Sequence, residues 1–158
     1  MDFLIYLEQT AIATWVRESP SLWAYATVLT LHTLGLSFLV GLNTAIDLRI
    51  LGIAARMPLA PMEKTYPIMW IAFWVNAISG TLLFMADATV KAFQLVFIVK
   101  MICIVLAVVN MQMLRTRVFH SPVLDKRPLS VNSKMLALSS LILWAGAITA
   151  GRLIAYIK

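Results

Sequence analysis

Two ionisable side chains, His32 and Lys100, stand inside long apolar stretches of this 158-residue sequence. An ionisable group at the centre of a bilayer costs several kcal/mol to leave in lipid, so it usually marks a functional site. Because a helix rises about 1.5 Å per residue, His32 lies roughly 15 Å beyond Ser21, where the first apolar stretch begins. Lys100 reaches nearly the same depth from the same side. We therefore expect the two side chains to lie at matched depth near mid-membrane.

His32 admits three chemical interpretations. It would bond as a neutral imidazole to a backbone carbonyl or to Asn76, bind haem or a metal ion, or carry protons. Lys100 would bond to carbonyls of a neighbouring helix, pair with a haem propionate or a lipid phosphate, or act in catalysis. Arg152 falls near the same membrane surface as Asp87, with which it could pair, and it is a second candidate partner for a propionate.

The remaining polar side chains of these stretches predict structural contacts. Asn76 and Asp87, named above, belong to the same set of structural polar residues. The full set is Asn43, Asp47, Arg49, Asn76, Asp87 and Asn110. Asn43 follows His32 by eleven residues, almost three full helical turns, and therefore lies on the same helix face. Asp47 and Arg49 would cap the helix end or form ion pairs there. Asn110 would join two helices through a hydrogen bond.

The composition indicates an integral membrane protein. Hydrophobic residues make up 61% of the chain and charged residues 13%, and the mean hydropathy is +0.88. A soluble domain carries roughly 45–50% apolar and about 25% charged residues. This excludes an ordinary cytosolic enzyme and a disordered tail. The net charge of +6 forms no basic face outside the apolar stretches, so no nucleic-acid partner is expected, and Cys103, the only cysteine, excludes an intrachain disulfide.

Four stretches are long enough to cross roughly 30 Å of hydrocarbon, which takes about 20 apolar residues. They predict membrane-spanning helices at about 21–46, 66–86, 92–114 and 135–156. Ser19 followed by Pro20 predicts the start of the first helix. That helix would continue past the membrane to about Met57, before Pro58 ends it. The predicted fold is an all-α integral membrane four-helix bundle over residues 19–158.

Residues 1–18 predict a separate amphipathic helix. Apolar residues recur at helical spacing, and Asp2 and Glu8 lie elsewhere around the wheel. A secretory signal would begin with a basic region, which this segment lacks. We expect the helix to lie in the membrane interface, anchored by Tyr6 and Trp15. The alternative is an exposed apolar leader.

The basic residues near the helix ends predict the orientation. Eight lie on one side: Arg49, Arg56, Lys64, Arg115, Arg117, Lys126, Arg127 and Lys134. Four lie on the other side: Arg17, Lys91, Arg152 and Lys158. The richer side is then cytoplasmic. In a bacterium this predicts an inner-membrane protein with periplasmic N- and C-termini, whose first partner is the lipid bilayer.

Several short motifs resemble those of a known family. They are SLWAY at 21–25, LHTLGL at 31–36, DLRILG at 47–52, SGTLLF at 79–84 and AGRLIAY at 150–156. Through them nearly the whole chain resembles an uncharacterised bacterial four-helix inner-membrane protein family, known as a domain of unknown function. The resemblance implies the fold and no activity. Its arrangement is loosely similar to small haem-binding and copper-resistance membrane bundles.

The chain departs from this family in its third helix. Members often carry Phe-His a few residues after the asparagine of that helix. This chain has Leu114 and Arg115 there, and His120 follows later, close to the cytoplasmic surface. His120 could be a shifted equivalent of the family histidine, although it lies far in depth from His32.

The leading hypothesis is a b-type haem protein or electron-transfer subunit with His32 as an axial ligand. A haem in a four-helix bundle needs an inward-facing histidine and basic partners for its propionates, which Lys100 or Arg152 could supply. One transmembrane histidine gives no bis-histidine site within one chain. Either the haem would have no second axial ligand, or Lys100 or a methionine would serve as that ligand. The remaining alternative is a homo-oligomer in which His32 of another copy is the second ligand.

The alternative hypothesis is a non-catalytic subunit of a membrane complex, or a small-solute or ion permease. Its polar cluster would comprise His32, Asn43, Asn76 and Lys100. Four helices are few for a complete transporter, so a permease would require an oligomer. The sequence contains no hydrolytic or nucleotide-dependent motif, and a redox role is the one that the leading hypothesis implies.

Overall fold

The computed structural model describes residues 1–119 and 130–156, and these residues form helices joined by short turns. Four helices are long: α3 (Leu22–Leu51), α4 (Tyr66–Met85), α6 (Leu95–Leu114) and α7 (Val131–Leu153). Each belongs to a stretch long and apolar enough to cross a membrane. The predicted all-α membrane bundle is therefore confirmed. His120 lies outside the described residues.

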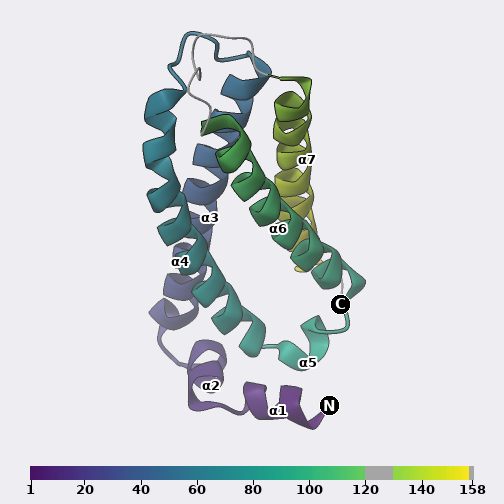
Figure 1. Ribbon diagram of the computed structural model, residues 1–158. Helices are drawn as coiled ribbons and strands as arrows, with labels where there is room; N and C mark the ends of the chain where they lie inside the picture. Colours follow the sequence, from purple (N-terminus) through teal and green to yellow (C-terminus); the bar gives the residue numbers. More distant parts are fainter. Residues whose placement is uncertain (120–129, 157–158) are drawn as a thin grey trace.

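The four long helices associate as two pairs (Figure 1). Helix α3 packs along α4 and α6 packs along α7, while α3 and α7 also contact each other and join the pairs. A short 3₁₀ helix, η1 (Ala60–Thr65), leads into α4, and a π-helical turn, η2 (Arg115–Phe119), extends α6. We call the end with η1 and η2 the basic end, and the opposite end the terminal end.

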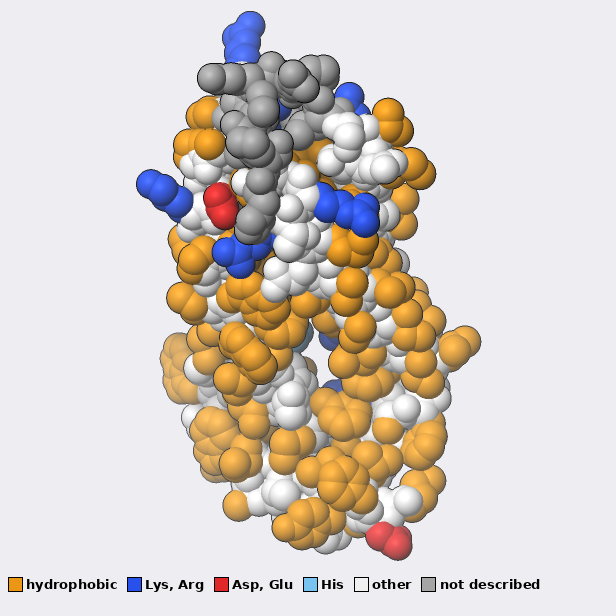
Figure 2. All heavy atoms as spheres, viewed as in Figure 1, with side chains coloured by type: hydrophobic (Ala, Val, Ile, Leu, Met, Phe, Trp, Pro, Cys, Tyr) orange, Lys and Arg blue, Asp and Glu red, His pale blue; other side chains and the backbone are white. Residues whose placement is uncertain are grey.

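Large apolar side chains cover the outside of the long helices. Figure 2 shows them over most of the visible face, with most of the basic side chains gathered toward the basic end. Exposed examples on the four helices are Phe38, Ile71, Trp74, Ile98, Ile102 and Ile142. Apolar side chains are stable on this surface only in contact with hydrocarbon, so the outer faces are suited to lipid.

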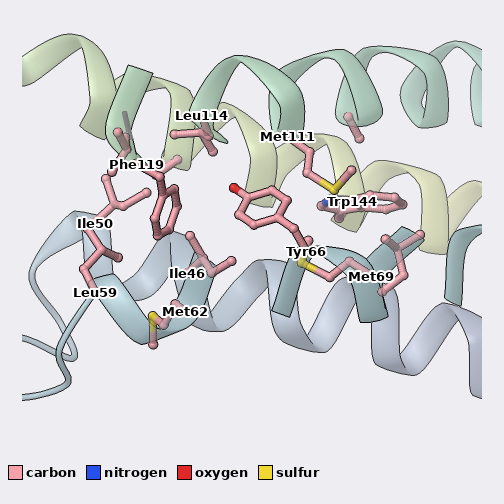
Figure 3. Close-up of a cluster of buried hydrophobic side chains, with 14 of the residues drawn as sticks. Ile46, Ile50, Leu59, Met62, Tyr66, Met69, Met111, Leu114, Phe119 and Trp144 are labelled. Carbon is pink, nitrogen blue, oxygen red and sulfur yellow. The ribbon is translucent and has the colours of Figure 1, made fainter. Parts of the chain in front are cut away.

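The buried core lies in the half of the bundle nearest the basic end (Figure 3). It includes Ile46, Ile50, Leu59, Met62, Tyr66, Met69, Met111, Leu114, Phe119 and Trp144. These side chains come from all four long helices and from both short helical turns. Tyr66 and Phe119 meet edge to face with ring centroids 5.5 Å apart. This half is therefore filled by packed side chains.

Glycines set the close approach of the helices in the other half. A Cβ atom added at Gly35 would lie 2.9 Å from the backbone oxygen of Ala72 and 2.9 Å from the backbone nitrogen of Asn76. The backbones of α3 and α4 are therefore in contact at this point, which only glycine permits. On the second pair, the Lys100 side chain lies against Gly151, 3.6 Å from where a Cβ would stand.

The limits of the first long helix differ from those predicted. Its N-cap is Ser21, whose hydroxyl accepts a hydrogen bond from the Trp23 amide, and Ser19 lies before it. The helix ends at Leu51, beyond the predicted residue 46 and before Met57. Gly52 ends it because its φ of 92° lies in the left-handed region that glycine adopts without strain.

The N-terminal segment forms two short helices in place of the single one predicted. They are α1 (Asp2–Glu8) and α2 (Ala11–Glu18), and Thr10 caps the second by accepting a hydrogen bond from the Ala13 amide. Ala13 and Val16 are buried against the bundle, while Tyr6 and Trp15 are exposed. The segment is thus amphipathic, and its place in the membrane interface stays a prediction.

Two polar contacts fasten this segment to the turn after α4. The Glu8 carboxylate accepts hydrogen bonds from the amide and the hydroxyl of Thr89, each 2.8 Å long. The Arg17 guanidinium donates to the Ala86 carbonyl at 3.3 Å. Thr89 lies in the short helix α5 (Ala88–Lys91), which connects α4 to α6. These contacts hold the N-terminal segment formed by α1 and α2, which we call the leader, against the terminal end.

Candidate intramembrane site

His32 is held by the backbone and side chains of α4. Its Nδ1 atom lies 3.0 Å from the Asn76 carbonyl oxygen and 3.2 Å from Ser79 Oγ. In return, the Asn76 side-chain amide donates to the His32 carbonyl at 2.7 Å. A carbonyl oxygen can only accept, so Nδ1 carries the hydrogen of the neutral ring. The Nε2 atom then keeps its lone pair.

Two further features of α4 fix the imidazole. The Ser79 hydroxyl donates to the Val75 carbonyl at 2.6 Å, so its oxygen faces Nδ1 as an acceptor. A Cβ atom added at Gly80 would lie 2.9 Å from Cε1 of His32. The ring therefore occupies space that any other residue at position 80 would fill. No described residue forms a hydrogen bond with Nε2.

Lys100 lies on the opposite helix pair. It is half-buried, and its Nζ and Cε atoms both lie 3.6 Å from the Cβ position of Gly151. It is close enough to His32 for its charge to act on the imidazole. Among the described residues, none accepts a hydrogen bond from its ammonium group. An amine in this position needs an acceptor, because an unpaired charge inside a bilayer is costly.

An opening separates the two helix pairs at the depth of these residues. Figure 2 shows it passing between α4 and α6, in the half of the molecule nearer the terminal end, with an apolar rim. Basic side chains are visible inside it. His32 belongs to α3 and Lys100 to α6, so the two residues come from opposite helix pairs, and they are close enough to interact electrostatically.

Asn43 does not join this region, although it lies on the same face of α3 as His32. Its amide nitrogen donates to Asp47 Oδ2 and to Ser140 Oγ, each at 2.7 Å. The buried side chain of Leu39 lies between the two levels. The polar cluster expected from the sequence is therefore divided: Asn43 bonds to Asp47 and Ser140, whereas Asn76 bonds to His32.

The expected structural contacts are found in part. Asn110 joins α6 to α7, because its amide donates to the Leu136 carbonyl at 3.1 Å and to Ser139 Oγ at 2.7 Å. Arg49 donates to the Met57 carbonyl near the end of α3. Asp47 was expected at that end as well but is fully buried, because it lies on the face of α3 that packs on α7, where Asn43 bonds to both Asp47 and Ser140.

The expected pairing of Arg152 with Asp87 is not found. Asp87 pairs instead with Lys91, one helical turn away, with an N–O distance of 2.8 Å. This contact is local in sequence and lies within one short turn, so it forms without bringing two helices together. Arg152 is exposed near the end of α7, next to Gly151.

The sequence analysis missed Ser79, Gly80 and Ser140 as members of polar sites. A signal for the first two exists, because positions 76, 79 and 80 fall on one face of a helix. Serine and glycine are frequent in membrane helices for packing reasons, so their presence alone gave no reason to select them.

Among the described residues no three His, Cys, Asp or Glu side chains gather to hold a metal. His32 is the one histidine among the described residues, and its Nε2 atom makes no hydrogen bond with any of them. Comparison of the chain with protein-family models, curated proteins and solved structures gives no match.

Proposed function

We propose that this integral membrane protein is a b-type haem-binding electron-transfer subunit with His32 as axial ligand. The observation that carries the proposal is the hydrogen bond from Nδ1 to the Asn76 carbonyl. Histidines that bind metals almost always donate their other ring N–H to a carbonyl, carboxylate or water, which fixes the tautomer and raises ligand basicity. His32 already has this arrangement, and its Nε2 is unpaired.

Lys100 and Arg152 would hold the propionates. Both are basic, and the Lys100 side chain lies against Gly151, the residue that precedes Arg152 in the sequence. A propionate would supply the acceptor that the Lys100 ammonium lacks among the described residues. When bound, the haem supplies one-electron redox chemistry, whose potential depends on the axial ligand and the polarity around it. The chain provides the ligand, the apolar surroundings and the charge.

The axial coordination follows from the number of histidines. The described residues contain one imidazole, so we propose a five-coordinate haem within one chain. A homo-oligomer in which His32 of a second copy completes the coordination would give a six-coordinate spectrum, so spectroscopy distinguishes the two forms. We further propose the bacterial inner membrane as the location, with the basic end cytoplasmic and the termini periplasmic, because of the excess of basic residues at that end.

The alternative, a permease or a non-catalytic subunit, receives less support. A permeation path built from His32, Asn43, Asn76 and Lys100 would need these groups in sequence across the bilayer. Among the described residues, the packed core around Leu39 and Trp144 separates Asn43 from the other three. A non-catalytic subunit of a membrane complex would bind no haem.

Haem titration into the purified protein in lipid nanodiscs tests the proposal. The wild-type chain should bind with a saturable Soret change at one haem per chain. His32→Ala should lose that change while keeping its helical circular dichroism. Thr33→Ala is the matched control, because the Thr33 hydroxyl is exposed and bonds only to the Leu29 carbonyl. Equal titrations for wild type and His32→Ala would contradict the proposal.

A further inference from the structure

Asp47 is a fully buried carboxyl group that the haem proposal does not use. It is 0% exposed and lies on α3, nearer the basic end than His32. Its Oδ2 accepts a hydrogen bond from the Asn43 amide at 2.7 Å, and the same amide donates to Ser140 Oγ. Its Oδ1 is buried and has no hydrogen-bond partner among the described residues.

No described residue forms an ion pair with Asp47. The groups around it can be named element by element. Helix α7 presents Ser140, and α4 presents Tyr66, which is 1% exposed and interacts electrostatically with Asp47. The Arg115 guanidinium of η2 lies over the Tyr66 ring, 5.3 Å from its centroid, and Glu63 of η1 also acts on this tyrosine. Helix α6 contributes Met111 and Leu114 to the buried core, and its buried Asn110 bonds to α7.

A metal cation does not suit this group. Hard cations require about six oxygen ligands that point toward one place. Here Asp47 Oδ2 and Ser140 Oγ are both directed at one N–H donor group, that of Asn43. A cation beside them would face the positive end of that amide. The remaining oxygen, Oδ1, is a single acceptor atom. One such oxygen is too few ligands for a metal cation but is enough to bind one proton.

We infer that Asp47 is a proton-binding site inside the membrane that exchanges its proton with the basic end. The reaction is the formation of one O–H bond at Oδ1, with the proton supplied by water at that end and returned to it. A carboxylate without a partner charge is expensive to bury, whereas a carboxylic acid with hydrogen bonds is not. Tyr66, at the start of α4, and Arg115, in η2, both belong to the basic end, with which the proton would exchange.

Infrared spectroscopy of the protein in lipid tests this inference without any haem. The wild type should show the carbonyl stretch of a buried carboxylic acid, which shifts in D₂O and converts to a carboxylate band as the pH is raised. Asp47→Asn should remove that band. Glu63→Gln, which removes a carboxyl at the basic end, should leave the band in place.

Ser140→Ala keeps the inference testable if Asp47→Asn does not fold. This variant retains the carboxyl and removes one hydroxyl beside it, so the carbonyl stretch should move in frequency without disappearing. The inference would be overturned if the wild type showed no carboxylic-acid band and Asp47→Asn lost a carboxylate band instead, because Asp47 would then be ionised. A carboxylic-acid band that neither shifts in D₂O nor titrates would also overturn it.

Discussion

At the scale of single residues, the chemistry of His32 is decided by what its second nitrogen contacts. The Asn76 carbonyl and the Ser79 hydroxyl both face Nδ1, so the free lone pair belongs to Nε2. The same bond that makes His32 a satisfied structural histidine also prepares it as a ligand. The structural and the ligand interpretations of this residue are therefore compatible.

Replacement of Ser79 tests this arrangement. Ser79→Ala removes one of the two acceptors of Nδ1, and we expect haem affinity to fall about 10- to 100-fold, as for other groups that orient a ligand. Haem titration measures the change. Thr81→Ala is the control, because the Thr81 hydroxyl makes the same kind of bond to a backbone carbonyl but is exposed. Equal affinities in the two variants would remove Ser79 from the account.

At the scale of helices, the sequence predicted the lengths of the apolar spans well. It predicted less well the residues at which the helices begin and end. Hydrocarbon thickness fixes the number of apolar residues, so all four spans fall close to their expected positions. The ends depend on single local contacts. Gly52 adopts a left-handed conformation and ends α3 at Leu51, short of the predicted Met57. The burial of Asp47 depends instead on the packing of α7 on its face of α3.

The sequence predicted the depth of the candidate-site residues in the membrane, but it did not predict which residues of the other helices they contact. Helical rise alone brings His32 and Lys100 to one level. The separation of Asn43 from His32 depends on how α7 packs on α3, which places Ser140 beside Asn43. Nothing in the spacing of a single helix determines that contact, since it is made between residues 97 positions apart.

The approach of α3 to α4 gives a prediction with an internal control. Gly35→Ala would place a Cβ atom 2.9 Å from two backbone atoms of α4, which cannot move away as a flexible side chain can. We expect a loss of about 1–3 kcal/mol in the free energy of unfolding. Gly41→Ala meets nothing within 4 Å and should cause no loss. Unfolding in detergent mixtures measures both variants.

The attachment of the leader should depend on pH. The Thr89 amide and hydroxyl donate to the Glu8 carboxylate and hold its pKa below the ordinary value. Glu8 therefore contributes stability above its ordinary pKa, and this contribution disappears as the pH falls through the lowered pKa. Hydrogen exchange at the Thr89 amide, compared with a free peptide at each pH, should accelerate in that acidic range.

A substitution provides the control for this attachment. Glu8→Gln should give faster exchange at Thr89 already at neutral pH, whereas Asp2→Asn, in the first turn of α1, should not. Exchange at Thr89 that is unchanged in Glu8→Gln would show that the carboxylate does not hold the leader.

At the scale of the whole molecule, the distribution of charge predicts how the chain lies in the membrane. The basic end carries Arg49, Arg56, Lys64, Arg115, Arg117 and Lys134 among the described residues. In a Cys103→Ala background, a membrane-impermeant thiol reagent applied to intact bacterial cells should label Tyr156→Cys. It should label Lys64→Cys only after the membrane is opened. The reverse pattern would place the basic end outside.

The proposed function depends on haem binding at His32, whose Nε2 atom makes no hydrogen bond with the described residues. The most direct measurement is an ultraviolet–visible spectrum of the protein purified from a haem-replete bacterial host, before and after addition of dithionite. The account predicts a Soret band that shifts and sharpens on reduction, and its absence from His32→Ala. A folded wild-type protein that is colourless, and that stays colourless after haem is added, would contradict it.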